Sequence, residues 1–316
     1  MRDAFSDTIV RLAKADPNVL LLTGDHGYAL FDDFRKECPA QYINAGIAEQ
    51  NMVGMAAGLT RAGFRPIVYG LSAFVPVRVV EQIKLDIAHD QLPVILIGDG
   101  AGFVYSYLGT SHQSTEDIAC TRAIPNLSVY SPADRFELIS CMELAYQSKA
   151  PVYLRMGKSD RGDVHKGAQQ VKVGRLLEIK PGQSGDVAFI ATGSLVRTAM
   201  DIAADFCPDA AVWSVPFIKP IDSQQVTTIC AQSRAVVVLE EHSVLGGLGS
   251  VITEIACEFA PVRILRVGVQ DRFSEHCGSY EYLLKEHGLD RLSIEQRVHD
   301  FLQRNRSQKP SLVNQF

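Results

Sequence analysis

The sequence predicts an α/β protein with two doubly wound domains, the second smaller than the first. Two observations support this prediction. Short apolar runs alternate with longer segments of helical periodicity, the pattern of parallel strands that are joined by helices and covered by them on both faces. A polar, glycine-containing stretch at 158–170 then interrupts the alternation, and it reads as a linker. Beyond it the alternation starts again, which indicates a second domain.

In the first domain, 1–157, the chain opens with an amphipathic helical pattern, and apolar runs follow it. These runs predict buried strands, because they are short, rich in β-branched residues and bounded by turn residues. Longer periodic segments lie between them, and Ser131 followed by Pro132 is typical of a helix start. The predicted strands are VLLLT (19–23), IVYG (67–70), PVILIG (93–98), LSVY (127–130) and PVYLR (151–155).

The second domain, 171–303, repeats this pattern on a smaller scale. Helices are expected between its strands, ending near Cys207 and Gln232 and starting again at Gly249. The tail, 304–316, has little apolar content, so we expect it to be loose or laid on a partner. The predicted strands are DVAFIAT (186–192), AVWSVP (211–216), AVVVLEEH (235–242) and VRILRVG (262–268).

Composition excludes several classes of function. The 316 residues are 47% hydrophobic with a net charge of −5, which is ordinary for a soluble globular protein and argues against nucleic acid as the main partner. The amphipathic helical pattern at the start and the lack of a long apolar run lead us to expect neither a signal segment nor a membrane-spanning helix. The seven cysteines are an odd number without a CxxC pair, which predicts reduced, mostly buried thiols in the cytoplasm and no metal or disulfide framework.

One carboxylate stands out in the stretch INAGIAEQNMVGMAAGL, 43–59. Glu49 begins a helical segment that is otherwise rich in Gly, Ala, Met and Val. It could stabilise the helix N-terminus, an effect of under about 1 kcal/mol, or it could do chemistry on a buried group. Gly54, Ala57 and Gly58 lie at helical spacing, which predicts that another backbone packs closely there.

The segment GIAEQNMVGMAAGL, 46–59, resembles the pyrimidine-domain motif of the transketolase and deoxyxylulose-phosphate synthase family of thiamine diphosphate enzymes. The resemblance covers nearly the whole chain and implies that a pyrimidine-binding parallel-sheet domain precedes a transketolase C-terminal-like α/β domain. Further matches follow in the family's order: LLLTGD (20–25), YGLSAFVPVRVVEQI (69–83), GTSHQSTEDIA (109–119), SPAD (131–134), PVYLRMGK (151–158), VPFIKPID (215–222) and EEHSVLGGLGS (240–250).

The resemblance implies a catalytic role for Glu49, in a hydrogen bond to N1′ of the cofactor's aminopyrimidine. A carboxyl group in an apolar site resists ionisation, so its proton is available to the ring nitrogen. That proton favours the imino tautomer, whose nitrogen deprotonates the thiazolium to give the carbanion that attacks a ketose. On this interpretation the apolar surroundings keep Glu49 neutral and also pack the cofactor ring.

Five other residues match functional positions of the family. Phe74 would stack on the aminopyrimidine and Asp25 would lie close to the cofactor, although a core role and a turn role compete for them. His112 would be a second catalytic residue and would contact the substrate, where the alternative is a solvated loop histidine. Arg155 and Arg2 would hold a sugar phosphate, although for Arg2 a surface role is an equal alternative.

Two departures from the family affect the metal and the substrate. Gly98-Asp99-Gly100 and Asn126 look like the family's magnesium signature, but a loop follows the first and a second Asn is missing, so we interpret them as a coincidence and expect no metal site. In the substrate loop, Leu108 replaces an acid found in many transketolases. The donor and acceptor sugars therefore cannot be carried over from the family.

The chain thus resembles the C-terminal subunit of a split transketolase, a transferase of two-carbon ketol units between sugars, which we expect to be phosphorylated. It would dimerise and need an N-terminal, diphosphate-binding subunit that holds Mg²⁺. A β subunit of a 2-oxo acid dehydrogenase, a deoxyxylulose-phosphate-synthase-like enzyme and a non-catalytic assembly subunit are the alternatives. For Glu241, His242 and His276 we expect no role beyond interface packing.

Overall fold

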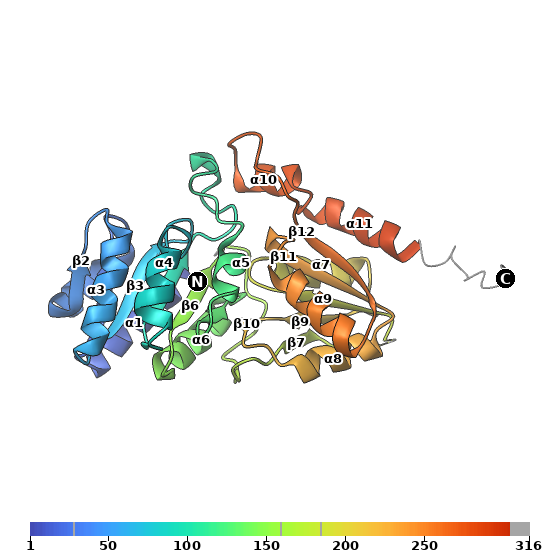
Figure 1. The fold of residues 1–316 in the computed structure, drawn as a ribbon. Coiled ribbons are helices and arrows are strands. Elements are labelled where there is room, and N and C mark those ends of the chain that lie inside the picture. The colour runs from blue at the N-terminus through green and yellow to red at the C-terminus, as the bar shows by residue number, and fades with distance from the viewer. Residues whose placement is uncertain (28, 159, 184, 304–316) are drawn as a thin grey trace, which may run out of the picture.

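The computed structural model describes residues 1–27, 29–158, 160–183 and 185–303. These residues form two sheets with helices around them, in two lobes that lie side by side (Figure 1). The expected tail, 304–316, lies outside the described residues. Within the described part of the chain, no helix has both the length and the apolar character needed to cross a membrane.

The first sheet has seven strands in the order β10-β5-β6-β4-β3-β1-β2. Its strands run parallel except β10, which pairs antiparallel with β5. All the strands predicted for this domain are present. The strand bounds are β1 (Val19–Thr23), β2 (Tyr42–Asn44), β3 (Arg65–Leu71), β4 (Ile95–Asp99), β5 (Ser128–Tyr130), β6 (Val152–Met156) and β10 (Phe217–Lys219).

Helices cover both faces of this sheet because its strands are apolar on both sides. In β1, Leu20 and Leu22 join one buried cluster with Met52 of α3, whereas Leu21 joins another with Phe5 of α1. The helices of this region are α1 (Arg2–Ala15), α2 (Asp32–Glu37), α3 (Glu49–Arg61), α4 (Val80–Gln82), α5 (Asp117–Arg122) and α6 (Arg135–Gln147).

Two local predictions differ from the structure. The helix expected from Ser131 and Pro132 begins later, because the side chain of Asp134 caps α6 by accepting from the amides of Phe136 and Glu137 at 3.0 and 2.9 Å. The periodic segment after Phe74 is not one α-helix. It forms a 3-10 turn, Val77–Val79, then α4, then a π-helix, Ile83–Ala88.

The second sheet has five strands in the order β12-β11-β8-β9-β7, with β7 antiparallel to β9 and the other pairs parallel. The polar stretch before it, 158–170, has neither helix nor strand among its described residues. The elements of this region are β7 (Leu177–Lys180), β8 (Val187–Ala191), α7 (Leu195–Asp205), β9 (Ala211–Ser214), α8 (Ser223–Gln232), β11 (Ala235–Ser243), α9 (Leu248–Phe259), β12 (Arg263–Val269), α10 (Tyr280–Glu286) and α11 (Arg291–Gln303).

The two lobes share a core. The buried cluster on the α3 face of the first sheet continues through Ile218 of β10 to Val236 of β11 and Leu248 of α9. Strand β10 itself follows β9 in the chain yet pairs with β5 of the first sheet, an exchange that the alternation pattern did not predict. The second lobe is therefore packed firmly against the first, and its β11 end lies beside the loop that leaves β4.

Candidate active site

The candidate residues gather at the carboxyl edge of the first sheet, where ligands of open α/β sheets bind. Asp25 follows β1, Phe74 follows β3, and His112 lies in the loop of residues 100–116 that follows β4. Glu49 begins α3, which leads into β3. The sheet order therefore brings together residues that are far apart in the sequence.

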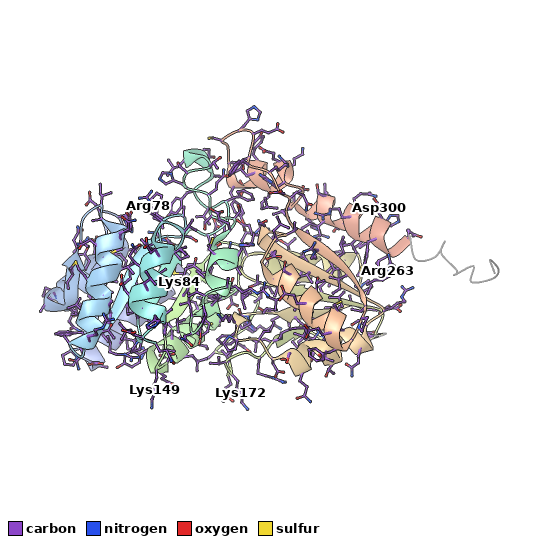
Figure 2. All side chains as sticks on the ribbon, in the orientation of Figure 1. Arg78, Lys84, Lys149, Lys172, Arg263 and Asp300 are labelled. Carbon is purple, nitrogen blue, oxygen red and sulfur yellow. The ribbon has the colours of Figure 1, made fainter. Side chains whose placement is uncertain are left out.

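Glu49 is 7% exposed and forms an ion pair with Arg78 of the 3-10 turn, with 3.2 Å between Arg78 Nη1 and Glu49 Oε2. Glu49 lies in the first turn of α3, whose N-cap, Ala48, makes no side-chain capping bond. The expectation of purely apolar surroundings is thus wrong in one respect, because a guanidinium lies beside the carboxylate. Figure 2 shows Arg78 at the end of the first lobe from which the 100–116 loop projects.

Arg78 and Phe74 together connect Glu49 to His112 in one row. The guanidinium carbon of Arg78 lies 4.0 Å from the centre of the Phe74 ring, and the ring of His112 meets Phe74 edge-on at 5.2 Å between centroids. His112 also lies 2.9 Å from Ser111 Oγ through Nδ1. A carboxylate, an aromatic face and an imidazole therefore stand in sequence. Arg78, which the sequence analysis missed, touches the first two.

Asp25 is exposed at the end of β1, next to the half-buried His26. Burial lowers the pKa of His26, and the negative charges of Glu49, Asp99 and Asp25 act against that shift. His26 therefore lies in the electrostatic field of Glu49. Like Arg78, His26 is a candidate site residue that sequence reasoning missed. Its position directly after Asp25 is the feature of the sequence that could have indicated it.

Arg155 lies inside the protein, 2% exposed. Its Nε donates to Asp117 Oδ2 at 2.8 Å, and its Nη2 donates to the carbonyl of Glu241 at 2.7 Å. Although burial opposes the ionisation of Asp117, the charge of Arg155 holds the pKa of that carboxyl below its usual range. These contacts tie β6 to α5 and β11, and they give no support to the expected phosphate contact.

Arg2 is exposed at the start of α1. Its charge acts on the phenols of Tyr69 and Tyr105, which donate to the buried carboxylate of Asp99 at 2.6 and 3.0 Å. Burial, and then the charge of Asp99, raise the pKa of both phenols, and the positive charge of Arg2 opposes this. Arg2 is thus placed with Tyr69 and Tyr105 at the carboxyl edge of the first sheet.

The Gly98–Gly100 segment contributes Asp99 to this tyrosine pair. Asn126, the other half of the apparent magnesium signature, donates its amide to the carbonyl of Ala88 at 3.1 Å. Among the described residues, no group of three or more His, Cys, Asp or Glu side chains is arranged to hold a metal ion.

Two of the three residues without an assigned role contact the first lobe. Glu241 Oε1 accepts from the amide of Phe103 at 2.8 Å. The buried His242 accepts at Nε2 from the amide of Ala119 at 3.2 Å and lies 2.8 Å from the Ser243 carbonyl through Nδ1, a pattern that fits a neutral ring. Burial lowers the pKa of His242 to about 4. The exposed His276 instead lies 3.5 Å from Tyr282 of its own lobe.

The family of the chain follows from its similarity to known domains. Residues 1–162 match the family described as transketolase, pyrimidine binding domain, and residues 177–294 match the transketolase C-terminal domain. The chain is also similar to a solved structure described as a split gene transketolase, inactive beta4 tetramer. That match has a TM-score of 0.86 and 32% identity, and it covers 96% of this chain and 97% of the other.

Curated relatives agree with this match. The chain is 32% identical over 308 residues to one subunit of an apulose-4-phosphate transketolase of Phocaeicola vulgatus, covering 96% of this chain and 97% of the relative. It is 34% identical over 305 residues to a putative transketolase C-terminal section of Methanocaldococcus jannaschii, covering 94% and 95%. A 1-deoxy-D-xylulose-5-phosphate synthase of Chlorobium luteolum is 33% identical, and the match spans 95% of this chain but 48% of that enzyme. The chain therefore belongs to the transketolase family, with a pyrimidine-binding domain followed by a transketolase C-terminal domain.

Proposed function

We propose that this chain is the C-terminal subunit of a two-subunit, thiamine diphosphate-dependent transketolase that transfers a two-carbon ketol unit between sugars. The observation that carries the proposal is the row of Glu49, Phe74 and His112 at the carboxyl edge of the first sheet. Relatives that are themselves named as single subunits of a transketolase, matched along almost their whole length, support the split arrangement. The substrates would be phosphorylated or similarly anionic sugars, in line with relatives named for apulose-4-phosphate and 6-deoxy-6-sulfo-D-fructose.

The residues present fit the aminopyrimidine end of the cofactor. The contacts that Arg78 makes with Glu49 and Phe74 indicate which kind of group these two residues can hold. Its guanidinium is flat, carries N–H donors, lies over the Phe74 ring and donates to Glu49. A flat heterocycle with an N–H group could make the same pair of contacts, a stack and a charge-assisted hydrogen bond. Glu49 and Phe74 would therefore hold the ring, with Asp25 close by.

The chemistry that thiamine diphosphate supplies when bound is a carbon nucleophile for the ketose carbonyl. The residues of this chain would hold and orient the cofactor ring and the sugar. Glu49 would hold a proton on the ring nitrogen, and the largely buried position of the carboxyl group excludes water from that bond. Phe74 would fix the ring plane, and His112, edge-on to Phe74, would donate to oxygens of the sugar. Arg2 is the better placed of the two proposed phosphate ligands, since Arg155 is committed to Asp117.

The diphosphate and Mg²⁺ would be held by the partner, a diphosphate-binding transketolase subunit. We propose a dimer of this chain completed by two partner copies. In α3, Ala57 is buried in the core, whereas a Cβ added at Gly54 or Gly58 would meet no described atom within 4 Å. The expected close packing is thus absent inside the described chain, and an open glycine face is available to a second copy. We propose a cytoplasmic location, which suits the seven free thiols.

Reconstitution tests the function. Purified chain and partner are mixed with thiamine diphosphate, Mg²⁺, an aldose phosphate as ketol acceptor, and either apulose 4-phosphate or 6-deoxy-6-sulfo-D-fructose as ketol donor. Ketol transfer is expected from the mixture and from neither subunit alone, and Glu49→Ala should remove more than about nine-tenths of it, a loss above about 1.4 kcal/mol. A folded Glu49→Ala complex with near-parental turnover would overturn the assignment of Glu49, and oxidative decarboxylation of a 2-oxo acid would overturn the reaction.

A further inference from the structure

Contacts with the second lobe help to hold the loop of residues 100–116, which carries His112. Within the loop, backbone hydrogen bonds form the short 3-10 turn Ser106–Leu108, an isolated bridge between Gly102 and Ser114, and a turn in which the amides of His112 and Gln113 donate to Gly109. The second lobe supplies further contacts through the Phe103 amide on Glu241, described above, and through α10, which lies beside the loop (Figure 1). Side chains of the second lobe therefore help to set where this loop lies.

The contact nearest His112 is made by its neighbour, Gln113. The side chain of Gln113 is buried, 6% exposed, and its Oε1 accepts from Ser274 Oγ at 2.9 Å. Ser274 Oγ lies 2.9 Å from His287 Nε2 as well. Since the single hydroxyl hydrogen goes to Gln113, His287 must donate to Ser274. The direction of donation is thus His287 to Ser274 to Gln113.

The ring of His287, at the start of this chain of hydrogen bonds, is held in place by packing. Its ring is 5% exposed and stacks on Phe103, with centroids 4.8 Å apart and planes at 22°. Gln113, Ser274 and His287 line a cavity of about 50 Å³ between the lobes. In the part of the chain that the structure describes, Gln113 Nε2 and His287 Nδ1 have no hydrogen-bonding partner, so the hydrogen bonds of both side chains depend on Ser274.

The position of Gln113 determines that of His112. The backbone amides of both residues donate to the carbonyl of Gly109, at 3.0 and 3.3 Å, and this tight turn leaves little freedom between them. Gln113 reaches the second lobe while the His112 ring meets Phe74. Releasing Gln113 would therefore let the His112 ring move away from the proposed sugar site.

We propose that Ser274 and His287 of the second lobe are positioning residues, which hold His112 against Phe74 through Gln113. The second lobe thereby contributes to sugar binding although none of its residues lies in the row of Glu49, Phe74 and His112. The kinetic part of this inference rests on the proposed function, whereas the geometric part can be tested on the chain alone.

The geometric test is an NMR comparison of full chains labelled with ¹³C in the histidine rings. The ring resonances of His112, assigned from their loss in His112→Ala, are shifted by the neighbouring Phe74 ring. Ser274→Ala should move them, and Ser274→Thr, which keeps the hydroxyl group, should return them towards the parental position. Ser279→Ala is the matched control, because it removes a serine hydroxyl that caps α10 by accepting from the Tyr282 amide and that, among the described residues, has no hydrogen bond to the loop.

If Ser274→Ala does not fold, His287→Phe replaces it, since phenylalanine keeps the stacking on Phe103 and removes the donor. Unmoved His112 resonances in a folded Ser274→Ala or His287→Phe chain would overturn the proposal, as would an equal movement in Ser279→Ala.

The kinetic test uses the assembled enzyme and the two donors named above. Ser274→Ala should raise KM for the donor that is turned over by about five- to tenfold, the effect of one lost hydrogen bond, with the Kd for thiamine diphosphate unchanged. A parental KM, or an equal rise in Ser279→Ala, would overturn the inference. If the parental complex turns over neither donor, the proposed function fails, while the NMR comparison still decides the geometric claim.

Discussion

The guanidinium of Arg78 donates to the carboxylate of Glu49, with 3.2 Å between Nη1 and Oε2. The same guanidinium covers the ring of Phe74 at 4.0 Å. Both groups that we assign to the aminopyrimidine are thus engaged by one side chain of the same subunit. Binding of the cofactor would require Arg78 to leave this position, so Arg78 and the cofactor would compete for Glu49 and Phe74.

Removing Arg78 should therefore tighten cofactor binding. Arg78 is about half exposed, so its contacts are weak, and we expect Arg78→Ala to lower the Kd for thiamine diphosphate of the assembled enzyme by about three- to fivefold. Calorimetric titration measures this. Arg61→Ala, which removes an exposed arginine paired with Asp90, serves as the control. A weaker affinity in Arg78→Ala would mean that Arg78 supports the cofactor.

His112→Ala should impair the use of sugar more than the binding of cofactor. The imidazole lies at the outer end of the row, 5.2 Å from Phe74, where it can donate to a sugar oxygen. We expect KM for the ketol donor to rise about tenfold, with Kd for thiamine diphosphate unchanged. His276→Ala, an exposed loop histidine in the second lobe, should behave like the parent. Parental steady-state kinetics in His112→Ala would remove this residue from the site.

Most of the strands could be predicted from the sequence, and Glu49, Phe74 and His112 could be proposed as candidates from it, because these signals are local. The short strands β2 and β7 were not among the predictions. Strand β1 is a short, fully buried run of aliphatic residues that ends in Thr23, and the Glu49 motif is one continuous segment. Strand β10 could not be predicted, because it is short and its partner, β5, lies far away in the sequence. Arg78 was missed because only folding brings the 3-10 turn to the start of α3.

The surroundings of Arg155 also could not be predicted from a local sequence pattern. Its place at the end of an apolar strand and the family resemblance favoured a phosphate ligand, but the buried Asp117 that binds it is 38 residues away. No local pattern indicates that pairing. The departure at Leu108, by contrast, was visible in the sequence, and Leu108 is exposed in the loop that carries His112.

The buried pair of Arg155 and Asp117 leads to a stability prediction. Arg155→Ala leaves a carboxylate uncompensated in the interior, so the free energy of unfolding should fall by about 3–5 kcal/mol. Urea unfolding of the purified chain measures the loss. Arg122→Ala, which breaks a more exposed pair with Glu254 between the lobes, should cost under about 1 kcal/mol. A parental stability together with a raised KM for a sugar phosphate would instead restore the phosphate role of Arg155.

A pH dependence is expected from His165. Burial opposes the charged imidazole, but the hydrogen bond to Glu137, 2.9 Å long, and the charge of that carboxylate outweigh it and raise the pKa of His165. Because the folded-state pKa lies above the unfolded value of 6.5, the stabilisation is complete below about pH 6.5 and is lost as the pH rises through the folded pKa.

Urea midpoints of the parent and of His165→Gln should thus differ most below pH 6.5 and converge at higher pH. His89→Gln, at an exposed histidine beside Asp90, should follow the parent at every pH. A difference between the parent and His165→Gln that does not vary with pH would show that His165 contributes by packing alone.

The central claim is that this chain provides the aminopyrimidine half of a cofactor site whose other half belongs to a partner. Titration of thiamine diphosphate and Mg²⁺ into the chain alone, and then into the chain mixed with its diphosphate-binding partner, tests it most directly. A diphosphate needs a metal or a cluster of donors to bind tightly. We expect weak or undetectable binding to the chain alone and tight, Mg²⁺-dependent binding to the mixture. Tight, Mg²⁺-dependent binding by the chain alone would contradict it and would return Asp99 of the Gly98–Gly100 segment to consideration as a metal ligand.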